Sequence, residues 1–403
     1  MIPIYAYTYG SIKQCIKRLS AQTRYQSILC YFVFFVGDNS ILLNTLHKLA
    51  LRNLLFLDPE IAHRLSIIAL KSGLLSFFPI HSDFRLNTKV AGISFPNPLG
   101  MAAGYDKNAE VPMELLKLGF GFVEVGTITP NPQDGNPRPR VFRLIKDQAI
   151  INQLGFNNEG SYAAFSRLSK MQTSSPIGVN IGANKDSKDF IMDYVYGIRQ
   201  FFTIASYFTI NISSPNTPGL RHLQKRQNLE KLLTRVMQTR EEEIIKTGKS
   251  VPIFLKISPD LSEEELDDIA TEAISHKVEG LIVSNTTLSR EGLQDSLNKE
   301  KIGGLSGSPL FLKSTIILAK MRQRVGSKMV IIGTGGVSST EDALEKIMAG
   351  ANLIQLYSAM VYEGISLPKS IIKGFSHFLD KEKKKSLEDI RGSRTEYWAK
   401  KEV

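Results

Sequence analysis

Eight short apolar segments, each ending in glycine or a small polar residue, recur through most of this 403-residue chain. They cover 96–104, 120–129, 176–184, 207–214, 252–258, 280–287, 329–336 and 353–360. The segments between them, such as 262–277 and 339–350, are long enough for helices. Apolar strands that alternate with helices indicate a parallel sheet covered on its faces. Eight such units predict a (β/α)8 barrel. A doubly wound open sheet is the alternative, but "GMAAGYDKNAE" after the first segment is not a GxGxxG fingerprint.

In a (β/α)8 barrel the chemistry sits at the carboxyl ends of the strands. The residues predicted there are Lys107, Thr127, Asn180, Asn211, Ser214, Lys256, Ser284, Asn285, Thr286, Gly335, Gly336, Tyr357 and Ser358. This set is rich in amides and hydroxyls, contains two lysines and lacks carboxylates. It suits a polar, anionic ligand and a cofactor that carries the chemistry, and it does not suit hydrolysis by a carboxylate pair or a metal.

The glycines of "GTGG" at 333–336, with Gly307 upstream, predict phosphate binding by the loops after the last two strands. The plainer interpretation is that these glycines permit tight turns. Lys256 lies inside an apolar strand, where an unpaired ammonium is costly, so we expect it to stabilise negative charge on a ligand or cofactor. Lys107 beside Asp106 also fits an ordinary surface lysine. Asparagine amides offer donor and acceptor together, which matches a pyrimidine ring, although asparagines also cap turns.

The chain is basic, with a net charge of +11 and a pI near 9.4. No zinc-finger, helix-turn-helix or aromatic-basic RNP motif accompanies this charge, so a nucleic-acid partner is not expected. A basic face against anionic lipid is favoured, and solvated lysines such as those in 380–389 are the simpler alternative. Cys15 and Cys30 are the two cysteines, and the six histidines are scattered, so no metal site is expected.

Four parts are predicted along the chain: a basic leader at 1–40, a helical segment at 41–80, the barrel at 81–380 and a charged tail at 381–403. The acid-poor leader fits a signal or transit peptide, a disordered leader or a misassigned start. Two apolar helices are expected near 41–56 and 59–72, the second with Asp58 as N-cap and Pro59 at its first position. They either pack on the barrel or form an amphipathic hairpin in a membrane interface.

Ten stretches together resemble dihydroorotate dehydrogenase, in that family's order, over roughly 41–375. They are "NPLGMAAGYDKNAE", "VEVGTITPNPQDGNPRPRVFRL", "AIINQLGFNNEG", "VNIGANK", "NISSPNTPGLR", "LKISPDL", "SNTT", "GGLSGSPL", "IIGTGGV" and "LIQLYSAM". The resemblance implies an FMN-binding (β/α)8 barrel. The membrane-linked, quinone-using class carries a serine as catalytic base and an N-terminal helical extension. Ser214 and the helical segment both point to that class.

The resemblance implies the site residue by residue. One FMN per chain would be held by Ala103, Gly104, Lys107, Thr127, Asn180, Asn211, Lys256, Ser284, Gly307, Gly336, Tyr357 and Ser358, with Ser284 where the family often has threonine. Orotate would be bound by Lys107, Asn152, Gln153, Leu154, Gly155, Phe156, Asn211, Asn216, Asn285 and Thr286. His63, Arg143 and Tyr357 would line the inner end of a quinone tunnel.

The implied reaction is the oxidation of dihydroorotate to orotate, in pyrimidine (UMP) biosynthesis. Ser214 would take the proton from C5, FMN would accept hydride from C6, and ubiquinone would receive the electrons. The expected setting is peripheral attachment to a bacterial inner membrane, with the mitochondrial inner membrane as alternative, as a monomer or weak oligomer. A soluble dihydroorotate dehydrogenase using fumarate or NAD, a flavin-free phosphate-binding isomerase or lyase, and a membrane-binding scaffold with a degenerate barrel are the rival hypotheses.

Overall fold

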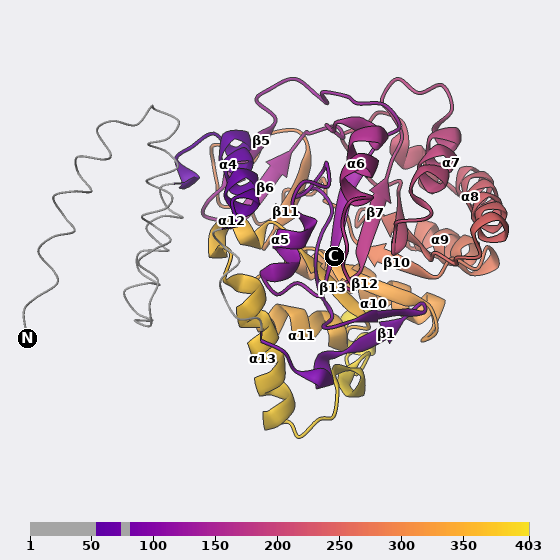
Figure 1. Cartoon of the computed structure of the whole chain (residues 1–403). Coiled ribbons are helices and arrows are strands. Elements are labelled where there is room, and N and C mark those ends of the chain that lie inside the picture. The colour runs from indigo at the N-terminus through magenta and orange to yellow at the C-terminus, as the bar shows by residue number, and fades with distance from the viewer. Residues whose placement is uncertain (1–53, 74–80, 403) are drawn as a thin grey trace, which may run out of the picture.

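A closed barrel of eight parallel strands forms the centre of the protein (Figure 1), in a computed structural model that describes residues 54–73 and 81–402. The strands follow the chain around the barrel, and β13 pairs with β3 to close it. They are β3 (Leu99–Met101), β4 (Phe122–Ile128), β7 (Ile177–Ile181), β8 (Tyr207–Asn211), β9 (Ile253–Ile257), β10 (Gly280–Val283), β12 (Val330–Thr334) and β13 (Leu353–Leu356). Each strand falls in one of the eight predicted segments, so the predicted (β/α)8 barrel is confirmed.

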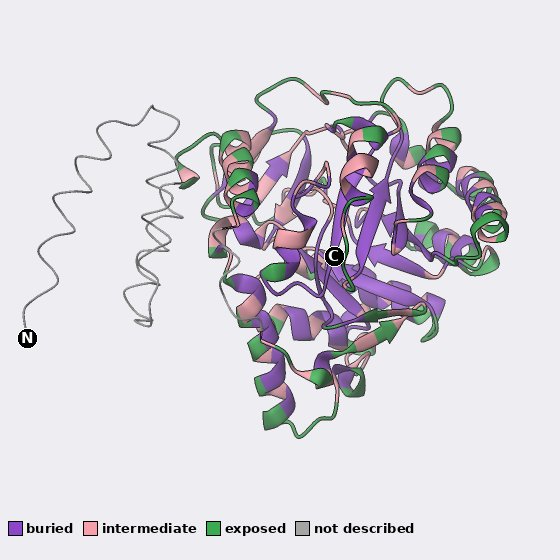
Figure 2. Ribbon diagram, viewed as in Figure 1, coloured by how far each residue is buried: buried purple, intermediate pink, exposed green. Residues whose placement is uncertain are grey.

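Helices follow the strands and cover the outside of the barrel; all but the last two connect successive strands. They are α5 (Pro112–Lys117), α6 (Gly160–Leu168), α7 (Phe190–Phe201), α8 (Arg226–Thr247), α9 (Glu263–Ser275), α10 (Leu310–Val325), α11 (Thr340–Met348), α12 (Ala359–Glu363) and α13 (Leu367–Lys381), with a 3-10 turn at Leu220–Gln224 before α8. Their inner faces are buried and their outer faces exposed, whereas the strands are buried throughout (Figure 2). This burial explains why the strands read as continuous apolar runs.

Aromatic rings fill the amino-terminal end of the barrel. Phe122 and Tyr207 occupy the space that a Cβ would need at Gly100 and Gly178, so two glycines make room for two rings. Phe254 packs beside Tyr207, with ring centroids 5.0 Å apart. A hairpin of β1 (Thr88–Val90) and β2 (Ile93–Phe95) closes this end from outside. Because this end is packed with rings, the cavity lies at the other end.

Two insertions build a small antiparallel sheet at the carboxyl end of the barrel. The chain after β4 supplies β5 (Val141–Leu144) and β6 (Ala149–Asn152), and the chain after β10 supplies β11 (Gly304–Gly307). Helix α4 (Pro59–Lys71) lies against this sheet (Figure 1). The sheet and α4 therefore form a wall above the strand ends.

Helix α4 begins as the sequence predicts. Asp58 is the N-cap and accepts hydrogen bonds from the N–H groups of Glu60 and Ile61, both at 3.0 Å, and Pro59 is in the first turn. The earlier predicted helix and the leader lie almost wholly outside the described residues. No helix among residues 54–73 and 81–402 combines the length and apolar character needed to cross a bilayer.

The end of the chain folds onto the barrel helices. A 3-10 turn (Leu387–Ile390) and helix α14 (Thr395–Ala399) follow α13, and α14 packs against α10. Trp398 is 6% exposed, and its Nε1 donates to Glu345 Oε2 at 2.8 Å. Most of the segment predicted as a charged tail therefore belongs to the packed structure.

Candidate functional site

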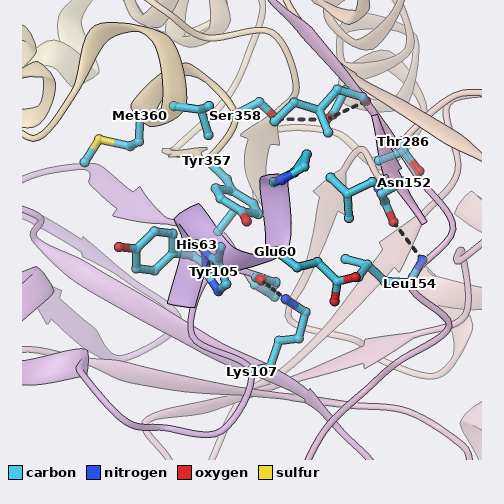
Figure 3. Close-up of a pocket in the computed structure, with 18 of the residues that line it drawn as sticks. Glu60, His63, Tyr105, Lys107, Asn152, Leu154, Thr286, Tyr357, Ser358 and Met360 are labelled. Carbon is cyan, nitrogen blue, oxygen red and sulfur yellow. Dashed lines mark hydrogen bonds between the residues drawn. The ribbon is translucent and has the colours of Figure 1, made fainter. Parts of the chain in front are cut away.

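A cavity of about 1110 Å³ lies at the carboxyl ends of the barrel strands, beneath α4 and the small sheet (Figure 3). The predicted residues that line it are Ala103, Gly104, Lys107, Thr127, Asn211, Ser214, Lys256, Ser284, Gly307, Gly336, Tyr357, Ser358, Asn152, Leu154, Gly155, Phe156, Asn216, Asn285, Thr286, His63 and Arg143. They come from seven of the eight strand ends, with β7 as the exception, from the inserted sheet and from α4. The fold thus brings residues of all three predicted sets together in one cavity.

The strand ends of β12 and β13 present glycine-rich and hydroxyl-bearing backbone. Gly335 and Gly336 have φ angles of 111° and 75°, which favour glycine, and both line the cavity. Ser358 Oγ donates to Ser306 Oγ at 2.8 Å, which joins the end of β13 to β11. Hydroxyls and glycine turns at this position suit the binding of a phosphate group.

Two lysines face the cavity: Lys256 is buried and Lys107 is half-buried. Burial lowers the pKa of Lys107 to about 8, and its Nζ donates to the Gly104 carbonyl at 2.7 Å. Burial also lowers the pKa of Lys256, while the charge of Glu124 opposes that shift. Among the described residues, no hydrogen-bond acceptor is found for Lys256 Nζ. An ammonium with unused donors at the cavity surface is suited to an anionic or electron-rich ligand atom.

Amide side chains from three strands form a buried hydrogen-bonded cluster. Asn211 Nδ2 donates to Thr127 Oγ1 at 2.9 Å and to Asn180 Oδ1 at 3.3 Å. Asn285 Nδ2 donates to Asn211 Oδ1 at 3.3 Å and to Ser213 Oγ at 2.9 Å. These contacts fix the amides before any ligand arrives, so they present a preorganised polar surface.

Ser214 lies just beyond β8 and is 6% exposed. Its Oγ accepts a hydrogen bond from the Asn216 N–H at 3.3 Å, and Asn216 Nδ2 donates to Asn152 Oδ1 at 3.1 Å. Asn136 Nδ2 donates to the Asn216 carbonyl at 3.1 Å. Among the described residues, no histidine or carboxylate contacts the Ser214 hydroxyl. The loop after β8 is therefore held against the inserted sheet with the serine facing the cavity.

Aromatic groups line the side of the cavity that α4 covers (Figure 3). The His63 ring lies edge-on to Tyr105 at 5.1 Å and 6.4 Å from Tyr357, between ring centroids. Burial and the nearby charge of Lys107 lower the pKa of His63 to about 3, so its imidazole is neutral near pH 7. Arg143 donates to the carbonyls of Leu55 and Leu57 at 3.1 and 2.7 Å. This side of the cavity suits an aromatic or apolar ligand.

Two predicted residues do not line the cavity. Asn180 is completely buried behind Thr127 and Asn211 and contacts both. Gln153 contributes backbone contacts instead: its N–H donates to the Arg140 carbonyl at 2.8 Å, and its carbonyl accepts from Asn136.

Several residues around the cavity were not predicted from the sequence. Glu124, Asn136, Tyr105, Ser306 and the Glu60–Arg140 ion pair were not singled out. Glu124 had a signal, since it is a charged residue inside the apolar run "FVEVGTI", as Lys256 is in its own strand. The Glu60–Arg140 ion pair had no signal in the sequence, because the two residues lie 80 positions apart.

The chemistry of the lining favours a bound organic cofactor over side-chain redox or hydrolytic groups. No cluster of three or more His, Cys, Asp or Glu side chains with metal-binding geometry occurs in the described part of the chain. The free donors of Lys256, the glycine turns at the end of β12 and the amides on β8 fit the ring and phosphate of a flavin nucleotide. The residues present therefore fit FMN.

The comparisons with known proteins agree on one family. A family model described as dihydroorotate dehydrogenase matches residues 85–379. The chain is 61% identical over 356 residues to the dihydroorotate dehydrogenase (quinone) of Rhizobium etli strain CIAT 652, covering 88% of this chain and 98% of that protein. It is 59% identical over 362 residues to the enzyme of the same name from Rhizobium rhizogenes strain K84, covering 90% and 100%.

Solved structures give the same result. The ligand-free DHODH of Eimeria tenella superposes with a TM-score of 0.79 at 38% identity and covers 83% of this chain and 99% of that one. The complex of that enzyme with ferulenol gives a TM-score of 0.78 at 38% identity, with coverage of 83% and 95%.

Proposed function

The chain belongs to the dihydroorotate dehydrogenase family, and on that premise we propose that it oxidises dihydroorotate to orotate and delivers the electrons to a quinone. This reaction is the redox step of pyrimidine biosynthesis. The observation that carries the proposal within the structure is the single cavity that holds Ser214, both lysines and the amide cluster under α4.

FMN is the cofactor that this lining fits. Lys256 would contact the flavin ring, and the glycines and Ser358 at the ends of β12 and β13 would hold the phosphate. Bound there, FMN would supply the acceptor for the hydride that leaves C6 of the substrate. Further predicted contacts of the cofactor include Ala103, Gly104 and Thr127 at the ends of β3 and β4.

The substrate would lie against the amide cluster, with Ser214 as the base. Asn211, Asn216 and Asn285 would match the alternating N–H and C=O groups of the pyrimidine ring. The ammonium of Lys107 would stabilise negative charge that develops on the ring as the C5 proton leaves. The Ser214 hydroxyl is buried, and among the described residues the Asn216 N–H is the one group that donates to it, so its oxygen is available to take that proton.

The quinone would enter on the side covered by α4, where His63, Tyr357 and Arg143 lie. A neutral His63 imidazole and the two tyrosine rings suit the uncharged ring of a quinone, for which we propose ubiquinone. Because α4 exposes Ile61 and Ile68 beside the cavity, we propose peripheral attachment to a membrane. The bacterial inner membrane is the favoured one, with the mitochondrial inner membrane as alternative.

The test is steady-state oxidation of dihydroorotate by Ser214→Ala, with a quinone or fumarate as acceptor. We expect a loss of kcat of at least about 100-fold, since a positioned base contributes roughly that much or more, with the flavin spectrum unchanged. The matched control is Ser161→Ala, which removes a buried hydroxyl that donates to the Pro130 carbonyl outside the cavity. Normal turnover by Ser214→Ala would show that Ser214 is not the catalytic base. Fumarate as the better acceptor would favour the soluble class.

A further inference from the structure

A carboxylate lies in the interior of the barrel, where the proposed function gives it no role. Glu124 is on β4, between Phe122, one of the rings at the amino-terminal end of the barrel, and Thr127 at the cavity. It has no exposed surface. Its Oε1 accepts from Asn180 Nδ2 at 2.7 Å. Its Oε2 accepts from Gln355 Nε2 at 2.7 Å and from the Tyr207 hydroxyl at 3.2 Å. A charged group buried this deeply is costly unless it is fully hydrogen-bonded, and here three neighbouring side chains donate to it.

The Glu124 carboxylate determines the orientation of the Asn180 side-chain amide. An ionised carboxylate only accepts hydrogen bonds, so Asn180 must turn its NH2 group toward Glu124. The Asn180 oxygen then faces the opposite way and accepts from Thr127 Oγ1 at 2.7 Å and from Asn211 Nδ2 at 3.3 Å.

The same constraint passes to the amides at the cavity. Since Asn211 uses its NH2 group toward Asn180, its oxygen faces Ser213 and Asn285 and accepts from both. Asn285 in turn uses its NH2 group there, and its oxygen accepts the Thr286 N–H at 2.8 Å. The orientation of each amide in this hydrogen-bonded series therefore follows from Glu124, which cannot donate a hydrogen bond.

The charge of Glu124 also acts on the lysine at the cavity. Burial lowers the pKa of Lys256, and Glu124 is the charged group that opposes this shift. Replacing the carboxylate by a neutral amide would change both the direction of the amides and the charge balance around Lys256.

We propose that Glu124 is a positioning residue that fixes the orientation of the Asn211 and Asn285 amides, and thereby the pattern of donors and acceptors that the substrate meets. The inference rests on the proposed function, because it assumes that these amides bind the pyrimidine ring. A glutamine at this position can donate as well as accept, so it would permit both orientations of Asn180 and of the amides beyond it.

The test measures orotate binding to the FMN-loaded protein from the change in flavin absorbance. For Glu124→Gln we expect the Kd of orotate to rise roughly ten- to a hundredfold, the equivalent of one lost charge-assisted hydrogen bond. The matched control is Tyr207→Phe, which removes the hydrogen bond to Oε2 and leaves the Oε1 contact with Asn180 in place. Its Kd should stay within about threefold of the wild-type value, since the direction of the amides does not change.

A double variant separates amide direction from local packing. In Glu124→Gln with Asn180→Asp, the new carboxylate at 180 accepts from Thr127 and Asn211 as the Asn180 oxygen does, and the glutamine donates to it. We expect this variant to recover orotate affinity to within about threefold of wild type. If Glu124→Gln alone does not fold, the same recovery in the double variant supports the proposal, and its failure to recover overturns it.

The outcomes distinguish this proposal from the one on which it rests. A wild-type protein that does not bind orotate would contradict the proposed function. Wild-type binding together with unchanged binding in Glu124→Gln would overturn the positioning role alone. Equal weakening in Glu124→Gln and Tyr207→Phe would also overturn it, because the carboxylate would then act only as part of the packing.

Discussion

Replacing Glu60 with glutamine tests how α4 is held over the cavity. Glu60 accepts from Arg140 Nη2 at 2.9 Å and from its Nε at 3.1 and 3.2 Å, and the two side chains are 19% and 4% exposed. Arg140 also donates to the carbonyls of Asp134 and Asn136. The ion pair therefore links α4 to the loop before β5.

The expected cost follows from this burial. Removing one partner of a buried ion pair costs about 3–5 kcal/mol. Because Glu60 is partly exposed and Arg140 keeps two carbonyl acceptors, we expect about 2–3 kcal/mol for Glu60→Gln. That corresponds to a shift of about 30- to 150-fold toward detached α4. Glu110, which pairs with Arg64 and Lys71 of α4, still holds the helix in the variant.

Hydrogen exchange measures this change locally. Amides of 60–71 should exchange faster in Glu60→Gln by about the same factor, while amides of α7 keep their wild-type rates. Glu114→Gln is the control, since that carboxylate makes a long, partly exposed ion pair with Lys117 at 3.9 Å. Glu60 also raises the pKa of Lys107, so the pH at which orotate binding weakens should move down in the variant. Equal exchange of the amides of 60–71 in the wild type, Glu60→Gln and Glu114→Gln would refute the reasoning.

Three further predictions concern pH and stability. Burial lowers the pKa of Lys107 to about 8. The affinity for orotate should therefore be constant below pH 8 and fall about tenfold per pH unit above it. An affinity that stays constant up to pH 9.5 would contradict this. Burial also holds the pKa of Lys346 well below its usual value, so the unfolded chain binds a proton that the folded protein lacks, and stability rises with pH up to about 10.5. Lys346→Met should flatten that slope in urea unfolding and add about 1–3 kcal/mol at pH 7; an unchanged slope would argue against a neutral buried amine. Trp398→Ala should cost about 3–5 kcal/mol in the same assay, and an unchanged midpoint would show that α14 does not stabilise the fold.

The strand ends were predictable because a parallel barrel brings every carboxyl end to one face. Once the eight apolar runs were aligned, Ser214, Lys256 and Asn285 were placed at that face from sequence alone, and the cavity contains all three. The position of Asn180 behind the lining was not predictable. The place of a residue along its strand predicts its depth in the barrel, but it does not predict which neighbouring side chains separate it from the cavity. The packed position of Trp398 was also missed, since a lysine-rich stretch precedes it and a single aromatic residue gives no periodicity.

The sequence by itself determined the barrel, the family and the residue types at the site, because alternating apolar runs and short motifs are local properties of the chain. Tertiary structure alone decided how those residues act on one another. Glu60 and Arg140 meet across 80 positions, and Glu124 receives the amide of Gln355 across 231. The pKa of Lys107, the neutral state of His63 and the direction of the Asn211 amide all depend on burial and on such distant partners. Folding creates these effects because it removes water from charged groups and leaves specific neighbours to replace it.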